Sequence, residues 1–329
     1  MDSALVIGGT RFIGRHLVTD LLEHDYRVIL FNRGRHENPF AEADRVDHVA
    51  GDRTDDAAVE SVAERVDPDV VFDVVAYHPE EVAHATRVFA DVRAYVYVSS
   101  GAAYAAETIP KREDETEIED CTSEQAEDDT AATYGNRKAE GDREVRRAAE
   151  RGVNAMSVRP PVVYGPHDYT ERLDYWLHRV AEYDRIAVPG DGTNLWQRSY
   201  VEDVASGMRV VAERGNPGEW YNVGDRNAVT LDRMLELAAE ALGTDVELVH
   251  ASDRELSIAG LDSNSFPLYR DYPHLLATNK LAALGWQSTP VETAMERTVA
   301  DHLASDRDGT ENGPSRESET RVLDVLETV

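Results

Sequence analysis

Tyr134 and Lys138 are the residues of this sequence whose types and spacing point most directly to chemistry. Residues four positions apart share one face of a helix, so the phenol and the ammonium group would meet there. A nearby ammonium favours the phenolate and lowers the pKa of a tyrosine from about 10 toward neutrality. Such a tyrosine can exchange a proton with an alcohol oxygen during hydride transfer. Only Lys111 and Lys280 are lysines besides Lys138, so a chance pairing is improbable.

A glycine-rich segment near the N-terminus predicts a phosphate-binding turn. It follows the apolar run 4–7 and precedes leucines at helical spacing. A glycine turn between a strand and a helix lets the backbone approach a pyrophosphate, and the helix N-terminus supplies N–H donors and positive potential. Its place at the first strand–helix junction makes a dinucleotide the expected ligand. The predicted cofactor-binding residues of this turn are Gly8, Gly9, Thr10, Arg11, Phe12, Ile13 and Gly14.

The end of the second expected strand bears on the choice of cofactor. Asn32 and Arg33 stand where a carboxylate would bind the ribose hydroxyls of NAD. Arg11 and Arg33 suit a ribose 2′-phosphate, because a guanidinium offers a bidentate fork. We therefore expect NADP or NAD, with NADP favoured; the alternative is that Arg33 is solvated and Arg11 touches only the pyrophosphate. Asp52 is expected to accept from the adenine amino group, and Arg53 to stack on the adenine.

Alternating strands and helices must position these residues. The expected strands cover 4–7, 27–31, 46–50, 69–76, 94–99 and 153–158, and the expected helices cover 57–65, 79–91 and 134–151. This alternation predicts an α/β fold with a doubly wound parallel Rossmann sheet. The acidic, aperiodic residues 105–130 are interpreted as a surface loop.

Three regions are predicted along the chain. Residues 1–165 are expected to form an NAD(P)-binding Rossmann domain, to which a strand within 201–224 returns. Residues 166–304 are expected to form a smaller C-terminal α/β substrate-binding region, with helices at 231–242 and 290–303 and a strand at 246–250. Residues 305–329 are acidic and poor in apolar side chains, so we expect a disordered tail, in which 321–329 could form a helical turn or two.

The charge balance is strongly acidic. Asp and Glu number 64 against 34 Lys and Arg, which gives a net charge of −30. Such a surface repels itself in dilute buffer and resembles an adaptation to molar salt. It also argues against nucleic acid as a partner, since phosphate binding needs a basic face.

Further composition features exclude other classes of site. Cys121 is the single cysteine, so neither an intrachain disulfide nor a cysteine-based metal site is possible. His167 and Asp168 lack further ligands at suitable spacing, and no metal site is predicted. The N-terminus lacks the basic flank of a signal peptide, and no apolar run approaches the ~18 residues of a membrane span. We expect a cytoplasmic protein.

Over about residues 4–304 the chain resembles an extended short-chain dehydrogenase/reductase of the NAD-dependent epimerase/dehydratase kind. The resemblance is carried by the glycine turn, by Tyr134 with Lys138, and by the segments 51–52, 98–104, 159–166, 221–224 and 284–286. It implies that Ser100 is the catalytic serine, Tyr134 the acid/base and Lys138 its partner. It further implies that the nicotinamide side is lined by Val75, Ala76 and Pro160, and Ser99 is counted with the cofactor-binding residues.

Departures from the family pattern refine the expectation. Arg11 replaces the middle glycine, as in an atypical branch that includes the chloroplast stem-loop-binding proteins, whose members can lack the catalytic tyrosine and bind RNA. Gly101 and Ala102 stand where 4,6-dehydratases carry an Asp-Glu pair, which disfavours dehydration by that route. Trp196 stands where nucleotide-sugar epimerases often have an arginine, and Arg198 follows two residues later.

We therefore expect an NAD(P)-dependent epimerase or dehydrogenase/reductase that acts on a sugar or nucleotide sugar by hydride transfer. The alternative is a non-catalytic nucleotide-sensing or RNA-binding protein of the atypical branch. His78, Tyr164 and Arg198 are the candidate substrate-binding residues; a solvated role for His78 and core packing for Tyr164 remain open. The resemblance also implies a homodimer.

Overall fold

The chain folds into two compact units in a computed structural model that describes residues 2–327. The first unit comprises Met1–Val163, Ser199–Gly224 and Leu276–Ser288. The second unit comprises Tyr164–Arg198, Asp225–Leu275 and Thr289–Val329. No helix among the described residues has both the length and the apolar character needed to cross a bilayer.

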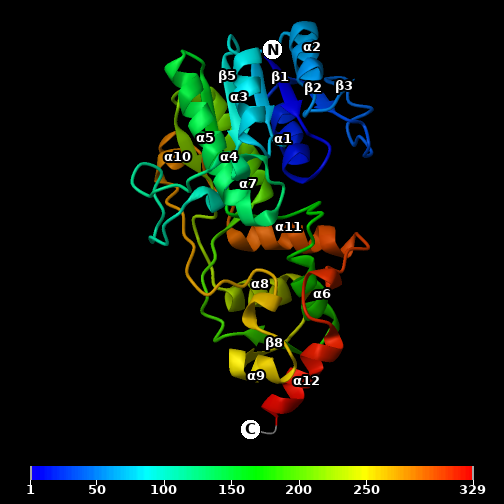
Figure 1. Cartoon of the computed structure of the whole chain (residues 1–329). Helices are drawn as coiled ribbons and strands as arrows, with labels where there is room; N and C mark the ends of the chain where they lie inside the picture. The colour runs from blue at the N-terminus through cyan, green and yellow to red at the C-terminus, as the bar shows by residue number, and fades with distance from the viewer. Residues whose placement is uncertain (1, 328–329) are drawn as a thin grey trace. The chain divides into compact units, whose positions relative to one another are not determined.

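A seven-stranded parallel sheet forms the centre of the first unit (Figure 1). Its strand order is β10-β6-β5-β4-β1-β2-β3. The strands are β1 (Ser3–Ile7), β2 (Arg27–Asn32), β3 (Val46–Ala50), β4 (Val70–Asp73), β5 (Ala94–Val98), β6 (Ala155–Arg159) and β10 (Trp220–Asn222). The predicted doubly wound α/β fold is confirmed, and 220–222 returns to the sheet beside β6. The inner strands are almost wholly buried, which explains their continuous apolar runs.

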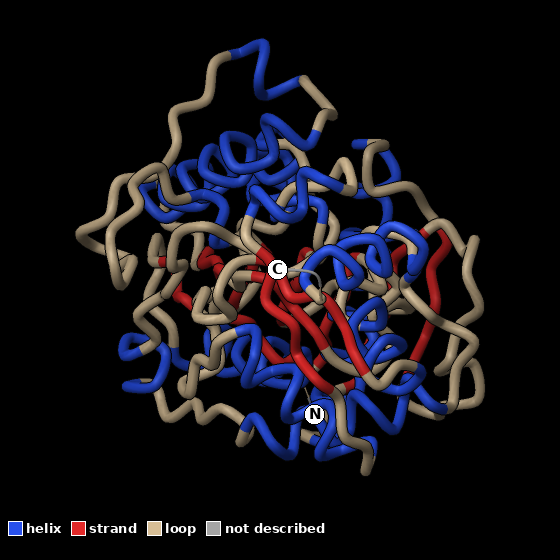
Figure 2. The backbone as a smooth tube through the Cα atoms, turned by 90° about the horizontal axis from the view of Figure 1, so that it is seen from below, coloured by secondary structure: helices blue, strands red, loops and turns tan. Residues whose placement is uncertain are grey.

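Helices cover this sheet, and Figure 2 shows strands gathered between helical segments. α1 packs against α7, whereas α3 packs against both α2 and α5. These helices are α1 (Phe12–Glu23), α2 (Asp56–Val66), α3 (Pro79–Val88), α5 (Tyr134–Glu150) and α7 (Val201–Arg214), joined by the short α4 (Ser123–Glu127) and α10 (Asn279–Ala283). The predicted helix 134–151 is thus present, and β4 is shorter than the predicted strand 69–76.

The predicted surface loop 105–130 is partly a buried element. Glu113 is buried, and its carboxylate accepts the backbone N–H of Asn222 at 3.0 Å. Strand β10 lies at the edge of the sheet, so the N–H of Asn222 has no neighbouring strand to bond. The acidic, aperiodic composition predicted a surface loop because it could not show that the carboxylate of Glu113 bonds the edge strand of the sheet.

The second unit contains a parallel strand pair and several helices. β8 (Arg185–Pro189) pairs with β11 (Glu247–Ala251), and α8 (Leu231–Leu242) packs against α6 (Asp174–Glu182) and α11 (Val291–Leu303). Gly243 ends α8 in the left-handed conformation that favours glycine. The remaining elements of the unit are α9 (Asp253–Ile258) and α12 (Arg316–Leu326). Two short strands, β7 (Val162–Tyr164) and β9 (Arg198–Tyr200), pair with each other, and each contains residues of both units.

The C-terminal residues differ from the disordered tail that their composition predicts. α12 buries Val322 and Leu323, and the buried carboxylate of Glu319 pairs with Arg179 at 3.2 Å and accepts the N–H of Ala187. A few buried apolar side chains are enough to hold α12 in place, because individual polar contacts also fix the segment.

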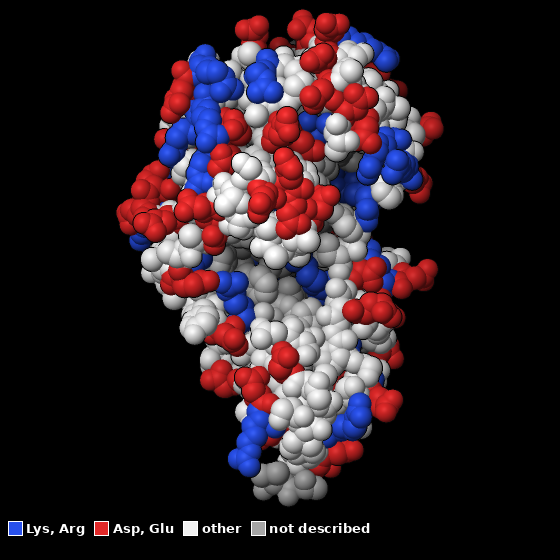
Figure 3. Space-filling model, viewed as in Figure 1, with Lys and Arg blue, Asp and Glu red and all other residues white. Residues whose placement is uncertain are grey.

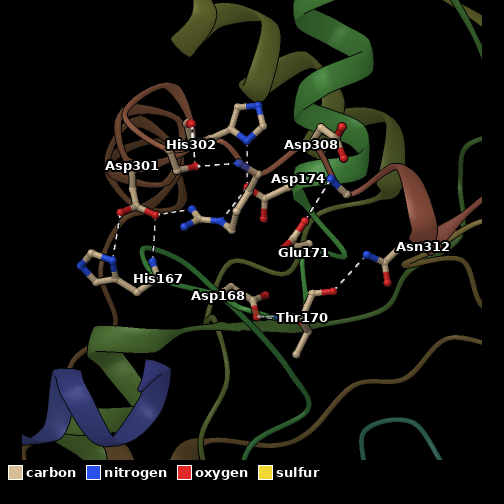
Figure 4. Close-up of polar contacts among 12 residues, drawn as sticks. His167, Asp168, Thr170, Glu171, Asp174, Asp301, His302, Asp308 and Asn312 are labelled. Carbon is tan, nitrogen blue, oxygen red and sulfur yellow. Dashed lines mark hydrogen bonds and ion pairs between the residues drawn. The ribbon is translucent and has the colours of Figure 1, made fainter. Parts of the chain in front are cut away.

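Residues that precede α12 in the chain make further polar contacts, which Figure 4 shows. His302 at the end of α11 lies 2.8 Å from the carboxylate of Asp174, and His167 lies 3.2 Å from Asp301. Arg307 bonds both carboxylates, and Asn312 donates to the carbonyl of Thr170. Such pairings between distant residues leave no periodic pattern in a sequence.

Candidate active site

The glycine turn after β1 has the shape of a phosphate cradle. Gly8 and Gly9 have φ values of +112° and +97°, which only glycine adopts readily. A Cβ on Gly9 would lie 2.6 Å from Leu30 Cδ2, and one on Gly14 would lie 2.5 Å from the Gly9 nitrogen. The first turn of α1 contains no acidic side chain, so its positive end is uncompensated there. The backbone therefore fits a pyrophosphate, as the motif predicts.

The end of β2 carries no carboxylate. The side-chain amide of Asn32 donates to Gly8 O at 3.2 Å, and its oxygen accepts from Gly34 N, so Asn32 holds the turn together. Arg33 is 53% exposed, and its Nη1 lies 3.9 Å from an oxygen of Asp52. The N–H and hydroxyl of Thr54 bond Asp52 and hold its pKa below the usual value.

Arg53, which is predicted to stack on an adenine, lies in a buried ion pair. Its guanidinium is buried and pairs with Asp73 at 2.7 Å, and it also donates to Glu81 O. The hydroxyl of Tyr95 donates to the same carboxylate at 3.0 Å. Arg53 thus neutralises a buried charge at the end of β4, a partnership that sequence distance conceals.

The structure brings Tyr134 and Lys138 together at the start of α5. Lys138 Nζ lies 5.7 Å from the centre of the Tyr134 ring, and 5.1 Å and 4.9 Å from the rings of Tyr77 and Tyr97. Lys138 is only 2% exposed. Burial lowers its pKa to about 8, although the negative charge of Asp73 opposes this shift.

Two backbone carbonyls hold the ammonium group in place. Lys138 Nζ donates to Ala76 O at 2.7 Å and to Val98 O at 2.8 Å. Ala76 follows β4 and Val98 ends β5, so the ammonium spans the carboxyl ends of adjacent strands. Val75 lies beside the glycine turn, since its side chain is 3.2 Å from an ideal Cβ on Gly8.

The two serines after β5 have different environments. Ser99 is buried, and its hydroxyl donates to the carboxylate of Asp142 at 2.8 Å. Ser100 is half-buried, and its oxygen accepts from Ala102 N at 3.2 Å. The carbonyl of Pro160, after β6, accepts from Gly101 N and ties the two strand ends together.

Asp142 is a site-supporting residue that the sequence analysis missed. It lies one helical turn beyond Lys138, is fully buried, and accepts from Ser99 Oγ at 2.8 Å, Ser157 Oγ at 2.5 Å and Arg159 Nε at 2.8 Å. These bonds tie α5 to β5 and β6. An acidic residue on the predicted buried face of a helix is the signal that could have revealed it.

The candidate substrate-binding residues are not brought together in one unit. His78 caps α3 in the first unit, and its Nδ1 and Nε2 lie 2.8 Å from Ala126 O and from Asp129 Oδ1. Its ring therefore holds the segment around α4. Tyr164 and Arg198 belong to the second unit, where Tyr164 is buried, as expected for core packing.

Comparison with known proteins gives consistent matches. A model of the NAD dependent epimerase/dehydratase family matches residues 4–224. The chain is 28% identical to the chloroplast stem-loop binding protein of 41 kDa b of Arabidopsis thaliana over 297 residues, which cover 86% of this chain and 74% of that protein. It is 26% identical to the low-salt glycan biosynthesis protein Agl12 of Haloferax volcanii over 335 residues, which cover 92% and 99%.

A solved structure supports the same fold. The dTDP-glucose 4,6-dehydratase from Bacillus anthracis, in complex with NAD, superimposes with a TM-score of 0.73 at 20% identity. The match covers 93% of this chain and 98% of that one.

Proposed function

Because the chain belongs to the NAD-dependent epimerase/dehydratase family, we propose that it is an NAD(P)-dependent epimerase or dehydrogenase/reductase that acts on a sugar or nucleotide sugar. The observation that carries this proposal is the Tyr134–Lys138 pair beside the ends of β4 and β5, on the sheet edge that also holds the glycine turn. In open parallel sheets, ligands bind beyond the carboxyl ends of the strands.

The first unit would hold the cofactor through its own residues. The N–H groups of the glycine turn would bind the pyrophosphate. Val75 and Ala76, which follow β4, and Pro160, which follows β6, would line the nicotinamide side. When bound, the nicotinamide supplies or accepts a hydride. Lys138 uses two of its three ammonium N–H groups on carbonyls, which leaves one for a ribose hydroxyl.

Tyr134 is the proposed acid/base. Its phenolate would remove the proton of a substrate hydroxyl while the carbon that bears this hydroxyl loses a hydride and becomes a carbonyl carbon. In the reverse direction the phenol would return the proton. The Lys138 ammonium favours that phenolate electrostatically. Ser100 would bind the same substrate oxygen through its hydroxyl, which its acceptor role toward Ala102 N leaves able to donate.

Two observations bear on the choice between candidate functions. Gly101 and Ala102 follow Ser100 and offer no carboxyl group for the elimination of water, so dehydration is disfavoured. The relative of 41 kDa is named for stem-loop binding, and this favours RNA binding as the second candidate function. The charge of −30 and the retained Tyr134 weigh toward chemistry.

The Tyr134→Phe variant tests the proposal. It removes the phenolic proton carrier, and we expect turnover to fall by about 10²- to 10⁴-fold, with NAD(P) affinity unchanged. The measurement is nicotinamide absorbance and product analysis over a panel of UDP- and dTDP-sugars in molar KCl. Tyr272→Phe is the matched control, since Tyr272 is an exposed tyrosine of the second unit. Unchanged turnover in Tyr134→Phe, or RNA binding without any turnover by the wild type, would contradict the proposal.

The cofactor preference is a separate prediction. Arg11 and Arg33 favour NADP, whereas the matched dehydratase structure contains NAD. Asp52 faces Arg33 at 3.9 Å and partly offsets its charge. Titration of both cofactors should show tighter binding of NADP, and Arg33→Gln should remove that difference. Tighter binding of NAD by the wild type would contradict the two-arginine argument.

A further inference from the structure

Asp73 is a fully buried carboxylate at the end of β4, three residues before the carbonyl group that binds Lys138. Its Oδ2 accepts from Arg53 Nη2 at 2.7 Å, and its Oδ1 accepts from Val75 N at 3.4 Å. The carboxylate therefore fixes the start of the loop that follows β4. The carbonyl oxygen of Ala76 in that loop then accepts from the ammonium at 2.7 Å.

The far end of the same loop is fixed by Glu81 on α3. The carboxylate of Glu81 accepts the N–H groups of Tyr77 and His78 at 2.7 Å and 2.9 Å. Arg53 connects the two ends, because its Nη2 donates both to Asp73 and to the carbonyl oxygen of Glu81. The loop that binds the ammonium is thus held from both sides by one buried polar network.

The charge of Lys138 depends on carboxylates that it does not touch. Among residues 2–327 it forms no direct ion pair, and its two hydrogen bonds go to uncharged carbonyls. Burial lowers the pKa of Lys138 to about 8, and Asp73 is the strongest of the charges that oppose this shift. Asp142 and Glu81 act in the same direction as Asp73, whereas Arg137 acts against them. Besides these groups, only the three tyrosine rings described above face the ammonium among the described residues.

We propose that Asp73 is a positioning residue for Lys138, which keeps the ammonium charged and in place beside Tyr134. It acts through the backbone of the loop after β4 and through the negative charge of its carboxylate. Arg53 anchors that carboxylate and compensates its burial. The consequence for turnover rests on the proposed function, whereas the effect on the ammonium does not.

The composition of the chain allows a direct measurement. The three lysines are Lys111, Lys138 and Lys280, so protein labelled with ¹³C and ¹⁵N in lysine alone gives three sets of side-chain signals. Lys111→Arg and Lys280→Arg assign them. A pH titration of the Lys138 signal then gives its pKa without any substrate or cofactor. We expect Asp73→Asn to lower this pKa by about 1, because an opposite charge is removed from the surroundings of the ammonium.

Matched variants separate this effect from a loss of stability. Asp73→Asn strands the charge of Arg53 and should also lower the melting temperature. Arg53→Met should lower the melting temperature but not the pKa of Lys138, because it keeps the carboxylate. Asp20→Asn breaks the ion pair with Arg209 between α1 and α7, and should leave that pKa unchanged.

The double variant Asp73→Asn/Arg53→Met removes both charges of the pair, so it provides the test if Asp73→Asn fails to fold. It should lower the pKa of Lys138 as Asp73→Asn does. An unchanged pKa in the variants without the carboxylate, or an equal fall in Arg53→Met, would overturn the inference.

Kinetics connect the inference to the reaction. The fall of kcat at alkaline pH should begin at lower pH in Asp73→Asn, in step with the pKa of Lys138, while KM at neutral pH stays the same. A lowered pKa of Lys138 without any turnover that depends on Tyr134 would contradict only the proposed function. Turnover that depends on Tyr134, together with an unchanged pKa of Lys138 in Asp73→Asn, would contradict only the inference.

Discussion

At the residue scale, Lys138 sets the pH range in which the proposed site works. Its pKa of about 8 lies below the ordinary value because the ammonium is buried among three tyrosine rings. The group is protonated below that pH and loses its charge above it. The phenolate of Tyr134 then loses its electrostatic support.

We therefore expect turnover to decline as pH rises above about 8. A pH profile of kcat at constant KCl measures this limb, and Lys138→Arg should shift it to higher pH, because a guanidinium stays charged. The lowered pKa of Lys138 also makes the free energy of unfolding depend on pH. The folded pKa lies below the unfolded one, so the cost of burying the charge is present at neutral pH and is relieved as pH rises through 8. An activity that stays flat to pH 10 would contradict the assignment.

Tyr134, Lys138 and the glycine turn could be predicted because local spacing carries their signal, whereas Ser100 was predicted from the family resemblance. The sequence could not predict the partners of Arg53 and Asp142, since Asp73 and Arg159 lie about twenty residues away on other strands. A charged residue's partner in the fold decides whether it faces a ligand or the core.

At the scale of elements, α5 is the part of the fold on which the site depends. Its start carries Tyr134 and Lys138, and Asp142 joins it to the ends of β5 and β6. Asp142 also pairs with the buried Arg159, whose guanidinium lies against the rings of Tyr104 and Trp220. The helix is therefore placed by buried polar bonds as well as by apolar packing.

Asp142→Asn should lower the free energy of unfolding by about 3–5 kcal/mol, because it leaves the charge of Arg159 buried and unpaired. Chemical denaturation in KCl measures this loss. Glu150→Gln, at the exposed end of the same helix, should change it by less than about 0.5 kcal/mol. Equal stabilities of the two variants would show that the ion pair does not hold α5.

Elements with strong local patterns were predictable, and those defined by distant partners were not. The strands of the parallel sheet and the helices α1, α5 and α8 follow continuous apolar runs or helical spacing. β8 was missed because its partner β11 comes about sixty residues later. α12 was predicted only in part, as a helical turn or two within 321–329, because Val322 and Leu323 are its only buried apolar side chains among the described residues.

At the scale of the whole molecule, the acidic net charge is the main feature that links stability to salt. Acidic side chains cover much of the face shown in Figure 3, over both units. With a net charge of −30, self-repulsion opposes the folded state at low ionic strength. Salt shortens the screening length from ~10 Å at 0.1 M to ~3 Å at 1 M.

The melting temperature should therefore rise by several degrees, on the order of 5–10 °C, between 0.1 M and 2 M KCl. Differential scanning calorimetry measures the change. Sucrose at matched water activity serves as the control for effects that do not involve charge. A melting temperature that is independent of KCl would refute the salt-adaptation argument.

The bond from Asn222 to Glu113 has a consequence for association between copies of the chain. An exposed edge strand offers its free N–H groups to any extended segment, and aggregation can start there. At β10 that donor is already taken by a side chain of the same molecule. Since β10 is itself buried, this position of the sheet edge offers no free donor to a strand from another copy of the chain.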